Sequence, residues 1–157
     1  MKITQQRDDR EVLDYEFYTQ HLLTVLYNRI TAFSSGQYLS KFGLGSVEMR
    51  VLASIGGQPG CKASVISALI SLDKAAVSRA IAKLESAGFV LGSTETPAAK
   101  QKRWSLSEEG WTVHDQFLDA VKARHAKVTD GIDEAELSAF TATLHKLIAN
   151  VDQLQDK

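Results

Sequence analysis

Residues 71–90, SLDKAAVSRAIAKLESAGFV, specify both ends of a short helix and constrain the fold more than any other stretch. Asp73 is a favourable N-cap, because its carboxylate can accept from an unpaired backbone N–H of the first turn. Leu72 and Val77 stand at the positions of a hydrophobic staple, and Gly88 supplies the left-handed residue that ends many helices. The stretch therefore predicts a helix that begins after Asp73 and ends before Gly88.

One face of this helix is apolar and must be turned toward a core. It is formed by four residues at helical spacing: Val77, Ala80, Ile81 and Leu84. The outward face consists of small and basic residues: Lys74, Ala75, Ser78, Arg79, Ala82 and Lys83. Bases on an exposed helix usually mean only a solvated face, so the neighbouring elements must decide whether this face binds another molecule.

Those neighbours predict a winged helix. A short helix over residues 62–70 precedes a tight turn near 71–73, which gives a helix-turn-helix. Residues 89–91 and 102–106 have strand-like patterns, and the polar loop 92–101 between them predicts a β-hairpin with an exposed tip. In the preceding helix, four apolar residues are expected to face inward: Val65, Ile66, Leu69 and Ile70.

The rest of the chain is predicted to be helical. An apolar stripe from Asp8 to about Phe33 indicates one long helix. This helix is expected to end at residues 34–36, and a short segment over 38–42 follows it. Ser46 opens a further helix before the turn at 56–60. Ser107 and Asp133 are expected to cap two terminal helices.

The last helix carries an a/d seam, whose members are Leu137, Phe140, Leu144, Leu147, Val151 and Leu154. Such a seam is more often internal core, but the terminal helices have no other layer to cover them. We therefore expect it to interdigitate with the first helix and with a second chain. The expected fold is mainly α with a small β-hairpin wing: dimerisation helices at 1–36 and 107–157 around a winged helix-turn-helix at 37–106.

Composition limits the function. With a net charge of −1 and a pI near 6.4, the chain has no uniformly basic surface, so any nucleic-acid surface must be local. No signal peptide or membrane span is evident, and the single cysteine forms no internal disulfide, so we expect a cytoplasmic protein. The sequence holds no recognisable catalytic constellation, cofactor motif or metal spacing, which argues against an enzyme.

Two motifs in order carry a family resemblance. The first motif precedes the hairpin and consists of Asp73, Lys74, the run 77–79 and the pattern Leu84-Glu85-x-x-Gly88. The second motif, SLSEEG at 105–110, follows the hairpin. Over essentially its whole length the chain resembles the MarR family of transcriptional regulators. The resemblance implies a homodimer that binds a pseudo-palindromic operator in double-stranded DNA, usually represses nearby genes, and releases DNA when a small ligand or oxidant acts.

On the recognition helix, the residue types fit DNA binding. Arg79 can pair bidentately with guanine, Ser78 can donate or accept, and Ala75 can approach a thymine methyl group. Lys74 and Lys83 suit phosphates better than base edges. Over residues 73–103, six bases stand against three acids, which predicts a local positive face and salt-sensitive binding.

The wing departs from the family pattern. Relatives commonly carry Asp-x-Arg near the tip, where this chain has Ala98 and Lys100. Lys100, Lys102 and Arg103 still supply positive charge to a minor groove, but the orienting carboxylate is missing and Lys lacks the planar fork of Arg. We therefore expect weaker wing contacts, and a winged-helix adaptor that binds a protein instead of DNA is the alternative function.

The sequence says less about the signal that the protein senses than about DNA binding. Family effectors lie between the dimer helices and the winged helix, so Tyr18, His21 and Trp111 are candidates for contacting a small aromatic or phenolic ligand. Equally, they can be core aromatics with wet polar ends. Cys61 is expected to be a small buried hydrophobe, with a redox role left open.

Overall fold

The computed structural model describes residues 2–94 and 101–155, which contain six helices and five strands. The chain divides into two compact units, one ending at His114 and the other beginning at Asp115. The first unit holds the winged helix, as the sequence predicted. None of the helices in the described part of the chain is long and apolar enough to cross a membrane.

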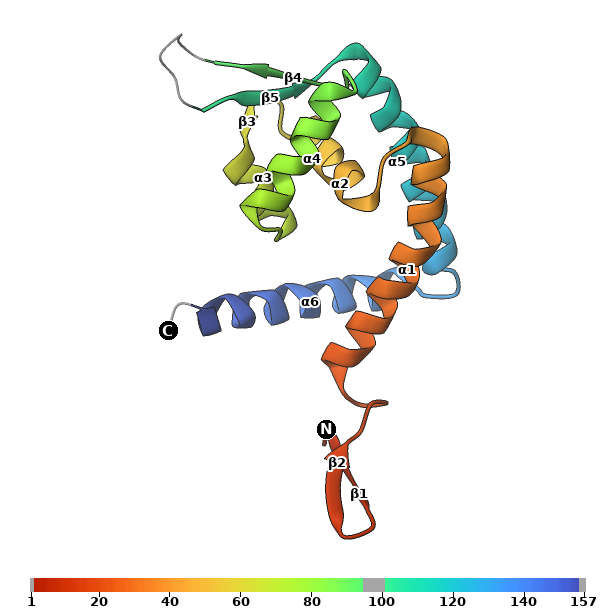
Figure 1. Cartoon of the computed structure of the whole chain (residues 1–157). Coiled ribbons are helices and arrows are strands. Elements are labelled where there is room, and N and C mark those ends of the chain that lie inside the picture. The colour runs from red at the N-terminus through yellow and green to blue at the C-terminus, as the bar shows by residue number, and fades with distance from the viewer. Residues whose placement is uncertain (1, 95–100, 156–157) are drawn as a thin grey trace. The chain divides into compact units, whose positions relative to one another are not determined.

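Three helices and a three-stranded sheet form the winged helix (Figure 1): α2 (Ser46–Gly57), α3 (Ala63–Ile70), α4 (Lys74–Ser86), β3 (Cys61–Lys62), β4 (Val90–Ser93) and β5 (Arg103–Leu106). The sheet order is β3-β5-β4, and both pairings are antiparallel. Apolar residues of α2 and α4 dominate the core, and Met49, Leu52 and Val77 are fully buried. The predicted hairpin is confirmed, whereas the two-residue strand β3 was not anticipated.

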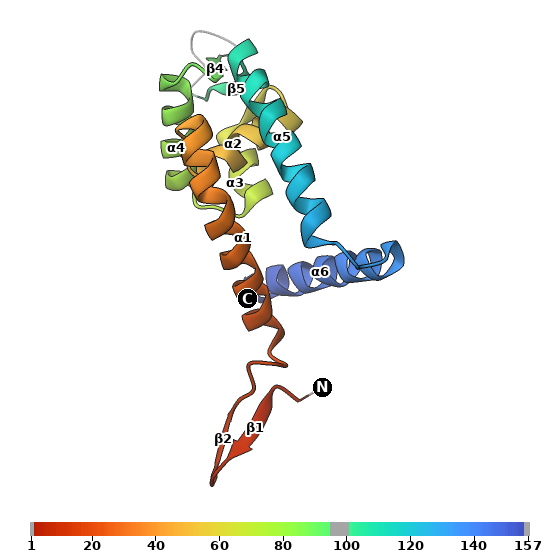
Figure 2. The same ribbon diagram turned by 90° about the vertical axis from the view of Figure 1, so that its right-hand side faces the viewer.

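The predicted helix over residues 8–33 is wrong at both ends. Residues 4–13 form a hairpin instead, with β1 (Thr4–Arg7) paired to β2 (Arg10–Leu13), and it precedes α1 (Thr19–Phe42) (Figure 2). Asp8 has a φ of 54°, a left-handed conformation that Asp tolerates in tight turns. Asp8-Asp9 was therefore a turn signal inside an apparently helical stripe.

Helix α1 also runs through residues 34–36, where the sequence predicted its end. The hydroxyl of Ser34 is buried and donates to the carbonyl of Ile30 at 2.8 Å, so this serine is satisfied within the helix. The helix ends instead at Gly43, whose φ of 67° allows its N–H to bond to the carbonyl of Leu39. No separate segment therefore exists at 38–42.

On α3, two of the four residues expected to face inward do not. Ile66 is 1% exposed, but Val65 and Leu69 are 41% and 55% exposed. An eight-residue helix has room for only one buried stripe, and Ile66 marks it. Val65 and Leu69 are four residues apart and form a second stripe on a flank of that face.

The second unit contains the end of α5 (Glu108–Val128) and α6 (Glu134–Gln155). Asp133 caps α6 as predicted, because its carboxylate accepts the backbone N–H of Glu136 at 2.8 Å. Along the predicted seam, Leu137 and Leu144 are half-buried, while four members are exposed in the single chain: Phe140, Leu147, Val151 and Leu154.

Candidate nucleic-acid interface

The ends of helix α4 are built as its sequence predicted. The carboxylate of Asp73 accepts the backbone N–H of Ala76 at 2.8 Å. At the other end, Gly88 has a φ of 77°, and the N–H of Phe89 bonds to the carbonyl of Leu84. These local bonds satisfy groups that a helix otherwise leaves unpaired, so α4 is held as one rigid rod.

The two faces of α4 are also confirmed. Val77 and Leu84 are fully buried, and Ala80 and Ile81 are each 3% exposed. All the expected outward residues are exposed in the described chain: Lys74, Ala75, Ser78, Arg79, Ala82 and Lys83. The small side chains between the bases leave this surface flat enough for close approach by a partner.

The turn before α4 is fixed by two side chains that sequence analysis did not single out. Arg50 of α2 donates to the carbonyl of Ile70 at 2.7 Å, and the hydroxyl of Ser67 donates to the carbonyl of Leu72 at 2.6 Å. Ser71, between them, has a left-handed φ of 50°. The pairing of Arg50 spans 20 residues, so no local pattern could have indicated it.

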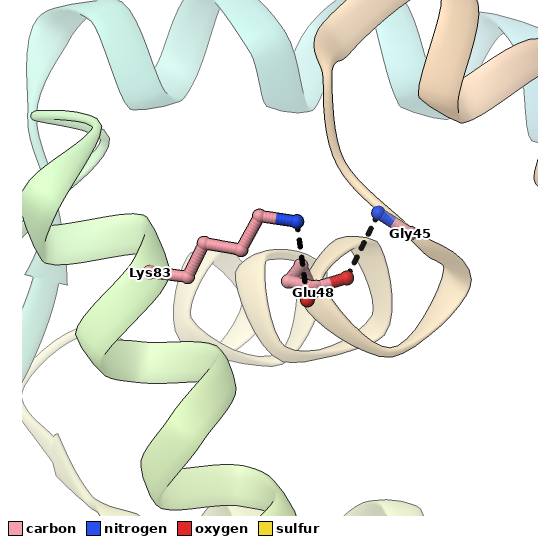
Figure 3. A network of polar contacts seen from close by, with 3 residues as sticks. All are labelled: Gly45, Glu48 and Lys83. Atoms are coloured by element: carbon pink, nitrogen blue, oxygen red, sulfur yellow. Dashed lines mark hydrogen bonds and ion pairs between the residues drawn. The ribbon is translucent and has the colours of Figure 1, made fainter.

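One predicted phosphate ligand, Lys83, is paired with a residue of α2 (Figure 3). Its Nζ lies 3.4 Å from Oε1 of Glu48, whose Oε2 accepts the backbone N–H of Gly45 at 2.8 Å. The Glu48 carboxylate therefore has two tasks: it caps the start of α2 and pairs with Lys83 of α4. Its side chain is only 20% exposed, against 48% for Lys83.

The wing cations are engaged as well. The ammonium of Lys102 lies 2.8 Å from Oε1 of Glu85 on α4 and 5.1 Å from the centroid of the Trp104 ring. Arg103 donates to the carbonyl of Gly60 at 3.2 Å and so fixes the turn that leads into β3. Lys100, Ala98 and the acidic Glu95 lie outside the described residues.

Three of the five described cations in residues 73–103 therefore already have partners within the chain. Among the described residues of 73–103, the side chains of Lys74 and Arg79 are the cations without an ion pair, hydrogen bond or ring contact to another described residue. Both are exposed on α4. The outer face of α4 thus holds the uncommitted positive charge of the described interface.

The motif SLSEEG joins the wing to α5. The Ser107 hydroxyl accepts the N–H of Gly110 at 2.9 Å, as a cap, and donates to the carbonyl of Gly88 at 2.7 Å. The backbone N–H of Ser107 bonds to the carbonyl of Phe89 at 3.1 Å. A Cβ on Gly110 would collide with that same carbonyl oxygen, so the glycine permits a close backbone approach.

Cys61 lies on β3, paired with Trp104 of β5, and is half-buried. Burial raises the pKa of the Cys61 thiol, which disfavours the reactive thiolate. This environment supports the expectation of a small hydrophobic residue. Residues 2–94 and 101–155 contain no cluster of three or more His, Cys, Asp or Glu side chains able to hold a metal ion.

The three candidate effector contacts are not brought together within the chain. His21 packs edge to face with Tyr15 at 4.6 Å, and Trp111 packs in the same way with His114 at 5.1 Å. Tyr18 occupies the N-cap position of α1 without a side-chain capping bond. Among the described residues, no hydrogen bond or ring contact joins Trp111 to Tyr18 or His21.

Comparison with known proteins finds one family whose sequence model matches part of the chain. Residues 42–103 match the sequence model of the MarR family. No curated protein matches the sequence significantly.

Solved structures share the fold over most of the chain. A MarR/EmrR family transcriptional regulator from Acinetobacter sp. ADP1 is 28% identical, with a TM-score of 0.83 over 90% of this chain and 99% of its own. A MarR family regulator from Silicibacter pomeroyi is 26% identical, with a TM-score of 0.77 over 87% and 92%. A putative MarR family regulator from Listeria monocytogenes, complexed with 26mer DNA, is 20% identical, with a TM-score of 0.80 over 85% and 89%.

The last of these likenesses shows the fold alone, whereas the match to the family model covers α2, α3, α4, β3 and β4 and ends at the first residue of β5. The resemblance to the MarR family is therefore confirmed: residues 42–103 match its sequence model, and the chain has the winged-helix fold of MarR transcriptional regulators.

Proposed function

We propose that this protein is a homodimeric regulator of transcription that binds a pseudo-palindromic operator in double-stranded DNA. One observation carries the proposal: α4 is capped at both ends, buried on one face, and uncovered on a face of small and basic residues. A helix of this kind fits the major groove. The structurally similar Listeria protein was solved in complex with 26mer DNA, which supports a DNA-binding function.

Within this proposal, Arg79 reads guanine and Ser78 and Ala75 contact neighbouring base edges. Lys74, at the start of α4, binds phosphate, where the positive end of the helix dipole adds to its charge. Lys83 and Lys102 reach phosphate only by exchanging a carboxylate partner for it. They therefore contribute less to affinity than Lys74 and Arg79.

We also propose a repressor that works in the cytoplasm and leaves its operator when a small aromatic or phenolic ligand binds. Tyr18, His21 and Trp111 are the proposed ligand contacts, and no catalytic activity or cofactor is expected. An operator-binding assay in the presence of a panel of aromatic acids tests this. Ligands that release the wild type should act at higher concentration on Trp111→Leu, and equal release of both would remove Trp111 from the site.

The decisive variant for the DNA proposal is Arg79→Ala, with Lys74→Ala as the matched loss of one cation. Fluorescence anisotropy with an operator and a scrambled duplex gives the discrimination between them. Arg79→Ala should reduce this discrimination about tenfold or more, because a bidentate base contact is lost. Lys74→Ala should weaken binding to both duplexes alike and lower the salt slope.

Both variants should remain dimers by sedimentation. Unchanged sequence preference in Arg79→Ala would contradict the assigned role of α4. The second candidate, a protein-binding adaptor, is favoured by the internal engagement of Lys83, Lys102 and Arg103. It predicts no salt-sensitive binding of any duplex.

A further inference from the structure

At the base of the wing, a glycine opens space for two larger side chains. Gly92 on β4 is paired with Trp104 on β5. A Cβ built on Gly92 would lie 2.8 Å from Cδ of Lys102 and 2.9 Å from Cζ3 of Trp104. The stem of Lys102 and the ring of Trp104 therefore lie across Gly92, so packing sets the direction that the Lys102 side chain takes.

That direction leads to the recognition helix. The Lys102 ammonium lies 2.8 Å from Oε1 of Glu85, and the two side chains are 50% and 41% exposed. Beside them, a cleft of about 170 Å³ separates α4 from the wing, with Ser78 and Trp104 among its lining residues. The ion pair thus spans a part of the α4–wing boundary that side chains do not fill.

The recognition helix is held by ion pairs on two flanks. Lys83 and Glu85 are two residues apart, about 200° around a helix, and they face different elements. Lys83 pairs with Glu48 of α2, whereas Glu85 pairs with Lys102 of the wing. On the α2 side the helix supplies the cation, and on the wing side it supplies the anion.

We infer that Glu85 is a positioning residue of the wing: through Lys102 it fixes the direction of the hairpin relative to α4, and so the place where the wing meets DNA. The inference rests on the proposed DNA-binding function. It gives a purpose to an acidic side chain on a surface expected to face phosphate. It also puts an orienting carboxylate at the base of a wing whose sequence has Ala98 instead of Asp near the tip.

The test compares Glu85→Gln with Asp73→Asn in the full-length protein. Both variants remove one negative charge from the α4 region, but Asn also caps helices well, and the Asp73 carboxylate bonds to the backbone of its own helix. Asp73→Asn should strengthen binding to operator and scrambled duplexes by the same factor. Glu85→Gln should instead lower the discrimination between them about threefold, the range that one exposed ion pair supports.

Two further measurements separate positioning from simple charge. The reversed pair, Glu85→Lys with Lys102→Glu, should restore discrimination, whereas each of these substitutions alone should lose it. Hydrogen exchange of the β4 and β5 amides without DNA should be faster in Glu85→Gln than in Asp73→Asn. Restored discrimination together with faster exchange supports the inference.

Failure of this inference can be distinguished from failure of the proposed function. If the wild type discriminates between duplexes and Glu85→Gln discriminates equally well, the inference is overturned while the proposed function stands. If the reversed pair stays as weak as the single variants, Glu85 acts through its charge alone and the inference is again overturned. If the wild type prefers no duplex, the proposed function itself fails.

Discussion

At the scale of single residues, Gly110 has the least room for a side chain of all the glycines, at the point where the first turn of α5 meets the residue that follows Gly88. Gly110 is buried, and its Cα faces the carbonyl oxygen of Phe89. That oxygen already accepts the backbone N–H of Ser107, so it cannot move away without breaking a hydrogen bond. The glycine of SLSEEG is therefore required by packing between two backbones.

Replacement of Gly110 by alanine should destabilise the protein by about 3 kcal/mol, because the new methyl group meets backbone atoms instead of a movable side chain. Thermal or urea unfolding measures the effect. Gly57→Ala is the matched control, since Gly57 is the exposed last residue of α2 and a Cβ there meets nothing within 4 Å. Equal stability of the two variants would show that the Phe89 carbonyl yields.

Cys61 should alkylate slowly in the folded protein. Its pKa is raised by burial, so at pH 8 the folded chain should react with iodoacetamide more slowly than the urea-unfolded chain. A thiol whose pKa is raised on folding adds stability below its ordinary pKa of about 8.5, and that stability is lost as the pH rises through the folded pKa. Faster alkylation of the folded chain would indicate an activated thiolate and a redox role.

The charge of the interface could not be predicted residue by residue. The sequence counts six bases against three acids over residues 73–103, which is correct as composition. However, Lys83 is paired with a residue 35 positions away, and Arg103 donates to a carbonyl 43 positions away. Such partners depend on tertiary packing, which no local pattern encodes.

At the scale of elements, α2 and α4 are joined by a single carboxylate. Glu48 satisfies the N–H of Gly45 at the start of α2 and pairs with Lys83 across the gap (Figure 3). Since Gly45 lies three residues after the last residue of α1, this carboxylate connects the α1–α2 junction to α4.

Glu48→Ala should lower the free energy of unfolding by about 1 kcal/mol, because it leaves the half-buried N–H of Gly45 without its partner. Lys83→Met, which removes only the exposed ion pair, should cost less than about 0.5 kcal/mol. Urea unfolding of both variants measures the difference. If the two variants lose the same stability, the bond to Gly45 contributes nothing.

How far the elements could be predicted depends on how local their signals are. The prediction of helix α4 was correct because all of its signals are local: the N-cap, the apolar stripe and Gly88 lie within the helix or at its ends. Strand β3 was missed because a two-residue strand is defined only by its partner β5. The first hairpin was missed because Val12 and Leu13 also fit a helical stripe, so periodicity outweighed the turn at Asp8-Asp9.

At the scale of the whole molecule, the exposed seam of α6 should be the contact of a homodimer. Val151→Glu puts a charge into that seam and should raise the dimer dissociation constant at least tenfold, because an unpaired charge is costly in an apolar interface. Gln153→Glu adds the same charge two residues away, outside the seam, and should leave the dimer intact. Sedimentation measures both, and two equally stable dimers would exclude the seam from the interface.

Selection of bound duplexes from a random DNA pool, at two salt concentrations, tests the central claim that α4 reads DNA. The account predicts a two-fold symmetric motif with half-sites about 34 Å apart and binding that weakens steeply with salt. Enrichment of no sequence by the purified protein, or binding insensitive to salt, would contradict it.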